Sequence, residues 1–389
     1  MKITDNVHYV GIFDKELRVF DVIMRTEHGT TYNSYLITGE KNVLIETVKE
    51  GFTDEFIANI SKIIDPKDID YIILNHTEPD HSGALKNILK IAPKAVVYAS
   101  KGACINLKNI LNEDFEHVAV KDGDELSLGD KKIKFISAPF LHWPDSMFSY
   151  LEDENLLFTC DAFGSHFCDE RLFDDLVGDY HYDFLYYFAH IMRPFKDNVI
   201  SACDKISDLD IKMICPSHGP VLRADPQKTI AEYREMSHIE KSVTKAIIVH
   251  VSAYGNTTNM AEKIKEGLVN KGVEVAMYEA TDVDIGSLLD DFEHSSALVL
   301  GSPTINGDAL KPIHDVLSSL ATVKIRGKIG AAFGSFGWSG EAVNIIQARM
   351  KSIKLKTIND GVKVKFIPTA DDLQTCVKFG EDIADAIKV

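Results

Sequence analysis

Four potential metal ligands lie within six consecutive residues of this chain: His76, Glu78, Asp80 and His81. Their segment, NHTEPDHSG, follows the apolar run DYIIL and precedes the helical pattern ALKNILKIA, so we predict a loop between a buried strand and a helix. Side chains in so tight a loop cannot all reach one ion, whereas alternate side chains can diverge toward two neighbouring ions. The spacing therefore predicts a two-metal centre.

Three further candidate ligands follow later apolar runs: His142 in SAPFLHWPDS, Asp161 in LLFTCDAFG and His218 in MICPSHGP. A carboxylate has two oxygens, so Asp161 is able to bridge two metals. Taken alone, each of these residues is better interpreted as a hydrogen-bonded loop histidine or an N-cap aspartate. Together, seven ligand-type residues at four strand ends favour a metal centre.

The ligand pattern resembles that of the metallo-β-lactamase superfamily, whose zinc hydrolases carry His-x-His-x-Asp-His in the first loop. Here the second histidine is replaced by Glu78. A carboxylate oxygen is a harder ligand than an imidazole nitrogen and suits iron better than zinc, which favours redox chemistry over hydrolysis. His-x-Glu-x-Asp-His, followed by His, Asp and His on later loops and then by a flavodoxin-type region, is similar to the flavodiiron protein family. This resemblance covers essentially the whole chain.

The family resemblance implies a role for each candidate ligand. One iron is implied to take His76, Glu78 and His142, the other Asp80, His81 and His218, with Asp161 bridging the two.

Two further residues resemble residues that lie near the iron pair in the family. Tyr187 is one of them, although the family's usual Tyr-Tyr-Ala-Asn reads here as Tyr187-Phe188-Ala189-His190, and an aromatic packing role stays open. His28, in HGTTYNSYL, is the other, with a plain loop histidine as the alternative. The remaining histidines are expected at the surface or in packing: His8, His117, His166, His181, His190, His238, His250, His294 and His314.

Three loops near the C-terminal end have the character of a flavin site. The first follows the strand AIIVHV and opens a helix, so its hydroxyls and backbone N–H groups face an anion at a helix N-terminus. It lacks the glycine pattern of dinucleotide-binding loops and the Gly-Lys-Ser/Thr of nucleotide triphosphate loops, so the monophosphate of FMN fits better. The loops resemble those of flavodoxins, and Trp338 is placed to flank the flavin ring, with an exposed packing residue as the alternative. Their residues are Ser252, Ala253, Tyr254, Gly255, Asn256 and Thr257; Ser302, Pro303, Thr304, Ile305 and Asn306; and Ser335, Phe336, Gly337, Trp338, Ser339 and Gly340.

The elements that must position these residues differ between the two halves of the chain. Short apolar runs such as NSYLIT, DYIILN and NLLFTCD alternate with polar loops at first, whereas strands alternate regularly with helices from AIIVHVS onward. The second pattern predicts a flavodoxin-like, doubly wound parallel sheet of five strands, and the resemblance implies a metallo-β-lactamase-like αββα sandwich before it. We predict an α/β protein with domains at residues 1–245 and 246–389, and interpret PQKTIAEYREMSHIEK as a helical connector.

Composition limits the partners of the chain. Its 42 basic and 59 acidic residues give a net charge of −17, which disfavours nucleic acid and anionic lipid. The start MKITDNVHYV lacks a signal-peptide pattern and no apolar run is long enough for a membrane helix, so we expect a cytoplasmic protein. Without a Cys-x-x-Cys pair, we expect no rubredoxin or zinc-ribbon module.

The resemblance implies a flavodiiron oxidoreductase that reduces dioxygen to water, with nitric oxide as a second substrate reduced to nitrous oxide. It also implies a head-to-tail homodimer or dimer of dimers, and an external electron donor, either rubredoxin or a deazaflavin cofactor. Two other hypotheses stay open. One is a metallo-β-lactamase-type zinc hydrolase with an accessory flavodoxin domain, and the other is a gas sensor or electron shuttle that does not turn over its ligand.

Overall fold

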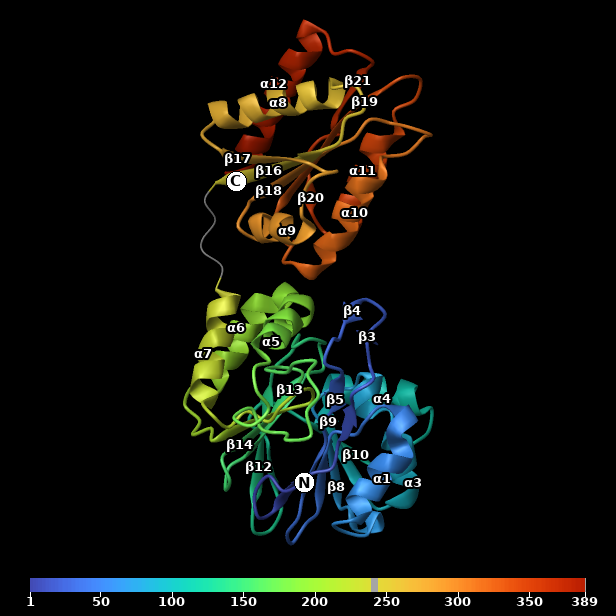
Figure 1. Ribbon diagram of the computed structural model, residues 1–389, viewed down its shortest axis with the longest axis vertical. Helices are drawn as coiled ribbons and strands as arrows, with labels where there is room; N and C mark the ends of the chain where they lie inside the picture. The colour runs from blue at the N-terminus through green and yellow to red at the C-terminus, as the bar shows by residue number, and fades with distance from the viewer. Residues whose placement is uncertain (239–243, 389) are drawn as a thin grey trace. The chain divides into compact units, whose positions relative to one another are not determined.

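The computed structural model describes residues 1–238 and 244–388. The chain divides into two compact units, Met1–His238 and Ile239–Val389, each with its own core (Figure 1). The proposed domain boundary between residues 245 and 246 stays a prediction, and residues 239–243 lie outside the described part of the chain.

The N-terminal unit contains two facing sheets. The order across the first sheet is β1 (Val7–Tyr9), β6 (Tyr35–Ile37), β7 (Val43–Ile45), β8 (Tyr71–Leu74), β9 (Val96–Ser100) and β10 (His117–Val120). The second sheet runs from β11 (Glu125–Ser127) through β12 (Lys132–Ser137), β13 (Met147–Leu151) and β14 (Leu156–Cys160) to β15 (Met213–Pro216). Two small pairs join β2 (Ile12–Asp14) to β5 (Thr30–Tyr32) and β3 (Val19–Phe20) to β4 (Met24–Arg25).

Helices cover the outer faces of both sheets, as the αββα prediction requires (Figure 1). Beside the first sheet lie η1 (Glu50–Phe52), α1 (Thr53–Ser61), η2 (Pro66–Asp68), α2 (Pro79–Ser82), α3 (Leu85–Ile91) and α4 (Lys101–Leu111). Beside the second lie α5 (His181–Tyr187), the π-helical turn η3 (Phe188–Met192), η4 (Arg193–Phe195), α6 (Lys196–Lys205) and α7 (Pro226–Ser237).

Alternation along the strands builds this sandwich. In β8, Ile73 belongs to the core between the sheets, whereas its neighbours Ile72 and Leu74 pack with the helices. In β14, Phe158 faces the inner core and Leu157 the helical side. The apolar runs recognised in the sequence are continuous because both faces of each strand are buried.

Helix α7 belongs to the N-terminal unit, so the prediction of a connector was wrong for its described residues. Ile230 and Tyr233 are buried in the same core as α5 and α6. The Tyr233 hydroxyl also accepts a 2.8 Å hydrogen bond from the backbone N–H of Phe163. A narrow apolar stripe is enough to bury one side of a mostly polar helix, which the polar composition concealed.

The C-terminal unit is a doubly wound parallel sheet. The order is β17 (Glu274–Glu279), β16 (Lys245–His250), β18 (Ala297–Gly301), β19 (Ile329–Phe336) and β20 (Lys356–Thr357), and β21 (Val362–Lys365) also pairs with β19. The fifth strand position predicted from the sequence is thus divided between β20 and β21, which pair with the start and the end of β19. Helices α8 (Asn256–Asn270) and α12 (Ala370–Ile387) pack on one face, and α9 (Ile285–Glu293), α10 (Lys311–Ser319), η5 (Leu320–Thr322) and α11 (Glu341–Ser352) on the other.

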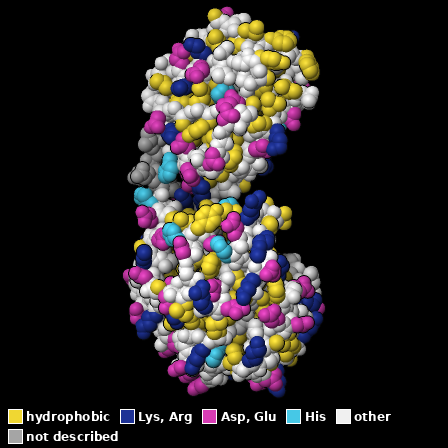
Figure 2. All heavy atoms as spheres, viewed as in Figure 1, with side chains coloured by type: hydrophobic (Ala, Val, Ile, Leu, Met, Phe, Trp, Pro, Cys, Tyr) yellow, Lys and Arg dark blue, Asp and Glu magenta, His cyan; other side chains and the backbone are white. Residues whose placement is uncertain are grey.

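Charged side chains of both signs are spread over the face shown in Figure 2 and do not gather in one patch. No helix among the described residues has the length and apolar character that crossing a membrane requires.

Candidate metal centre and flavin loops

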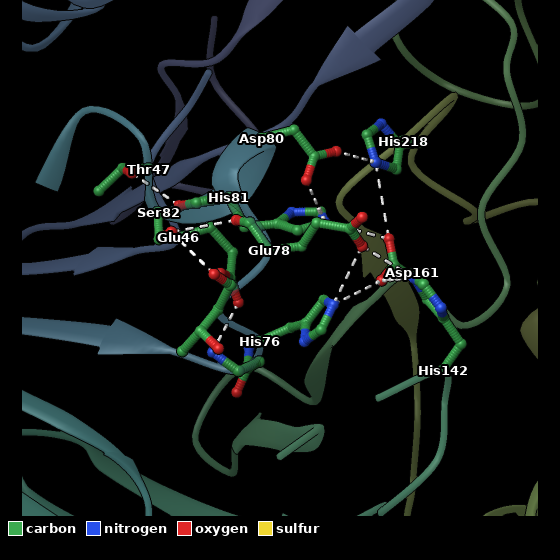
Figure 3. A network of polar contacts seen from close by, with 12 residues as sticks. Glu46, Thr47, His76, Glu78, Asp80, His81, Ser82, His142, Asp161 and His218 are labelled. Carbon is green, nitrogen blue, oxygen red and sulfur yellow. Dashed lines mark hydrogen bonds and ion pairs between the residues drawn. The ribbon is translucent and has the colours of Figure 1, made fainter. Parts of the chain in front are cut away.

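The loop that follows β8 carries the first four candidate ligands (Figure 3). The chain leaves the sheet at Leu74, and α2 begins with Pro79, whose fixed φ suits the first position of a helix. His76 and Glu78 therefore precede the helix, whereas Asp80 and His81 lie on it. This change from loop to helix divides the four side chains into two pairs.

The first pair joins His142 in one half of the cluster. The Nε2 of His142 lies 2.9 Å from Oε2 of Glu78, and the Nε2 of His76 lies 3.3 Å from the same oxygen. The second pair joins His218 in the other half. The Nε2 of His218 lies 3.1 Å from Oδ2 of Asp80, and the Nε2 of His81 lies 3.3 Å from Oδ1.

Asp161 lies between these halves. Its Oδ1 is 3.2 Å from Nε2 of His81 and 3.5 Å from Nε2 of His218. Its Oδ2 is 3.7 Å from Nε2 of both His76 and His142. Each oxygen thus faces one half, which is the geometry of a bridging carboxylate.

A backbone irregularity directs Asp161 toward the cluster. The register between β14 and β15 shifts between Phe158 and Cys160, and Cys160 has a φ of +52°. Bulges of this kind re-aim side chains beside functional sites. They follow from tertiary pairing, so the apolar run of β14 does not reveal them.

The chemistry of the cluster fits two cations. Apart from the close contacts within the cluster given above, both oxygens of Asp80, Oδ2 of Asp161 and Nε2 of His81 are buried and make no hydrogen bond among the described residues. Buried polar groups without partners are rare, because each one carries a desolvation cost. A pair of metal ions would satisfy all of these atoms at once. Glu78 and His142 are partly exposed, at 16% and 20%, so their half is the more open one.

The ionisation of the cluster without a metal reflects mutual attraction of acids and imidazoles. Burial alone would raise the pKa of Asp161, but the surrounding histidines, His81 first, hold it well below its usual value. Burial opposes protonation of His76, yet its hydrogen bonds to Asp145 and Glu78 raise the pKa of the imidazole to about 9. Without a metal, the histidines thus supply the positive charge that the carboxylates attract.

Tyr187 reaches the cluster. It is fully buried, its hydroxyl donates a 3.0 Å hydrogen bond to Oδ1 of Asp161, and the π-helical turn η3 starts at the next residue. Turns of this kind occur frequently at functional sites. His28 is different, because its side chain is 52% exposed and its Nδ1 lies 3.0 Å from both carboxylate oxygens of Asp183. Among the described residues, no hydrogen bond, ion pair or ring contact joins His28 to the cluster.

Two residues beside the cluster were not identified from the sequence. His166 is buried, its ring centroid lies 5.3 Å from that of His218, and its Nδ1 is 2.9 Å from the hydroxyl of Thr30. Its buried position is that of a packing residue, and it lies beside a candidate ligand. Asp145 lies 3.3 Å from Nδ1 of His76. Its position three residues after His142, in the same loop, was the available signal.

The three predicted flavin loops meet at one end of the C-terminal sheet. The first lies between β16 and α8, the second follows β18, and the third begins with Ser335 and Phe336, the last two residues of β19. The hydroxyls of Thr257 and Ser335 are 3.0 Å apart and join the first loop to the third. The backbone N–H of Thr304 donates to the carbonyl of Ser335 at 2.9 Å, which joins the second loop to the third. The carboxyl ends of the parallel strands β16, β18 and β19 thus bring the predicted residues together.

The first loop has the properties of an anion site. Gly255 precedes α8 with a φ of +81°, which glycine adopts without strain. Among the described residues, no side chain caps this 15-residue helix, and its first turn contains no acidic residue. Its first N–H groups are therefore available to a phosphate. Tyr254 and Trp338 are 92% and 85% exposed on neighbouring loops, where a planar ring can contact them.

Fold and site together define a protein with a metallo-β-lactamase-like unit that carries a cluster of candidate metal ligands and a flavodoxin-like unit with an uncapped helix start beside the predicted flavin loops. Comparisons with known proteins agree with this class. The family model described as ODP family beta lactamase matches residues 30–219, and the flavodoxin model matches residues 248–380. Together these regions include every predicted metal and flavin residue.

Full-length relatives define the family further. The chain is 44% identical to flavo-diiron protein FprA2 of Clostridium acetobutylicum, with 100% of this chain and 99% of that protein covered. It is 38% identical to a nitric oxide reductase of Moorella thermoacetica, with coverage of 99% and 98%. The solved rubredoxin oxygen:oxidoreductase of Desulfovibrio gigas superposes with a TM-score of 0.72 at 30% identity, covering 100% of this chain and 98% of that one. The chain belongs to the flavodiiron protein family.

Proposed function

We propose that this protein is a flavodiiron oxidoreductase that reduces dioxygen to water and also accepts nitric oxide, which it reduces to nitrous oxide. The observation that carries the proposal is the position of Asp161, with one oxygen toward each of two histidine–carboxylate groups. Relatives named as a nitric oxide reductase and as a rubredoxin oxygen:oxidoreductase support both substrates.

The iron ligands are proposed from the two halves of the cluster. One iron takes His76, Glu78 and His142, the other takes Asp80, His81 and His218, and Asp161 bridges them. Bound there, the iron pair supplies electrons and open positions for a diatomic gas. The bridging role is supported by the divergence of the two Asp161 oxygens.

The protein's own residues control access to the cluster and hold its bridging carboxylate. The partly exposed side of Glu78 and His142 is the side from which a gas enters, whereas the nearly complete burial of His81 and His218 excludes water from the other half. Tyr187 holds Oδ1 of Asp161 through its hydroxyl. Burial first, and then the negative charge of Asp161, raise the pKa of Tyr187 well above its usual value, so this hydroxyl remains a donor at neutral pH.

FMN is proposed for the C-terminal unit. Its phosphate fits the uncapped start of α8, where Ser252 to Thr257 provide hydroxyls and backbone N–H groups. Its ring fits between the loops that start at Ser302 and Ser335, beside Trp338. Reduced FMN stores two electrons and two ferrous ions store two more, which together equal the four that conversion of dioxygen to water requires.

Further properties follow from the same proposal. A rubredoxin-type donor is supported by the name of the Desulfovibrio gigas relative, and a deazaflavin cofactor is the alternative donor. A head-to-tail homodimer, or a dimer of dimers, would bring the flavin of one subunit to the irons of another. We also propose cytoplasmic residence. Zinc hydrolysis is not favoured, because Glu78 replaces a histidine and a flavodoxin unit follows.

Metal analysis, flavin absorbance and anaerobic rapid mixing test this function. The purified protein is expected to contain two irons and one FMN per chain, and its reduced form to consume dioxygen and nitric oxide with flavin oxidation. Asp161→Ala is expected to lose the iron pair, whereas Asp114→Asn, at an exposed aspartate, retains it. Zinc in place of iron, or gas binding without consumption, would contradict the proposal.

A further inference from the structure

Asp145 is a buried carboxylate behind the proposed ligand His76. It is 2% exposed, and its Oδ2 lies 3.3 Å from Nδ1 of His76, the ring nitrogen opposite the Nε2 that faces Glu78 and Asp161. A histidine that binds a metal through one nitrogen is oriented by the partner of its other nitrogen. Asp145 occupies that position for His76.

The carboxylate of Asp145 is itself held in place. Its Oδ2 accepts a 3.0 Å hydrogen bond from the backbone N–H of Thr77 and a 2.7 Å hydrogen bond from the hydroxyl of Thr77. The same hydroxyl accepts a 3.0 Å hydrogen bond from Nδ2 of Asn106 on α4. The backbone carbonyl of Asp145 accepts from the hydroxyl of Ser100, which also caps α4. Helix α4 therefore anchors this side of the cluster.

The other half of the cluster has a different support. Nδ1 of His218 lies 2.6 Å from the backbone carbonyl of Thr31, a neutral acceptor. Glu46 lies near His81, but its Oε1 accepts from the backbone N–H of Asn75, and among the described residues it makes no hydrogen bond to His81. A carboxylate partner increases the electron donation of an imidazole more than a carbonyl does, because it stabilises positive charge on the ring.

We propose that Asp145 is a positioning residue that orients His76 and makes the His76 half of the proposed iron pair the more electron-rich half. This inference rests on the proposed function. It goes further because it assigns different binding strengths and different reduction potentials to the two irons. The buried carboxylate of Asp145 is the cause of both differences. The shape-conserving change Asp145→Asn removes the charge and keeps the volume.

The test measures iron affinity and reduction potential in the full-length protein. In Asp145→Asn, competition with a chelator is expected to show one iron bound about 10- to 100-fold more weakly and the other unchanged. An anaerobic redox titration is expected to show a higher reduction potential for the iron pair. The variant lacks the negative charge of Asp145, so its ferric state is less stabilised. Glu46→Gln is the control, at a buried carboxyl group near His81 without an imidazole hydrogen bond, and is expected to shift the potential less.

A second variant covers the case in which Asp145→Asn does not fold. Thr77→Val removes the hydroxyl that holds Asp145 and keeps the charge, so a smaller shift in the same direction is expected, with Thr77→Ser restoring the wild-type potential. Equal shifts in Asp145→Asn and Glu46→Gln, or equal weakening of both irons, would overturn the inference. A wild-type protein that binds no iron pair would instead refute the proposed function.

Discussion

Removing the hydroxyl of Tyr187 tests whether Asp161 depends on a neutral donor as well as on histidines. Tyr187→Phe deletes one buried 3.0 Å hydrogen bond to a carboxylate and creates almost no cavity. A hydrogen bond to a charged group contributes about 1.5–3 kcal/mol, so we expect the iron-free protein to lose about 2 kcal/mol of unfolding free energy. For a unit of this size, that loss lowers the unfolding temperature by about 4–8 °C.

Calorimetry of the iron-free protein measures this change in the transition of the N-terminal unit. Tyr35→Phe is the matched control, because the Tyr35 hydroxyl donates to the neutral carbonyl of Pro216, which keeps a second donor in Asn33. Its expected cost is about 1 kcal/mol. If Tyr187→Phe cost no more than Tyr35→Phe at neutral pH, the hydroxyl of Tyr187 would not stabilise an ionised Asp161.

Three other predictions concern the charge of the cluster and the flavin loops. In the iron-free protein, the folded pKa of His76 is about 9, above the ordinary value of 6.5. The stabilisation from its pairing with Asp145 and Glu78 is therefore fully present below pH 6.5 and lost toward pH 9. Urea unfolding should show the free energy of unfolding falling across that window, and a flat profile would contradict this. Trp338→Ala should weaken FMN binding by about 2- to 10-fold through loss of aromatic contact, measured by quenching of flavin fluorescence, and unchanged affinity would place the ring elsewhere. Gly334→Ala should destabilise the C-terminal unit in thermal unfolding, because a Cβ there would lie 2.0 Å from the carbonyl oxygen of Ser302. Gly272→Ala is the control for the cost of a positive φ alone, because nothing lies within 4 Å of a Cβ at that position. Equal losses of stability in the two variants would contradict the steric reason.

One prediction from the sequence failed because composition alone does not specify tertiary packing. Helix α7 was interpreted as a connector because its composition is polar, yet Ile230 and Tyr233 bury one side of it. The role of His28 near the metal stays a prediction, and its side chain is paired with Asp183 on α5. Composition and motif position do not specify which distant element packs against a residue.

The local sequence by itself determined the types of the candidate ligands, their division over four strand ends, and the three loops of the proposed flavin site. These features depend on strand-to-loop transitions and on residue chemistry, both of which are encoded over a few neighbouring residues. Only the tertiary structure decided that Asp161 presents one oxygen to each half of the cluster, and that Asp145 lies behind His76. Such relations depend on sheet order, register and a bulge in β14, which arise from pairing between segments far apart in the chain.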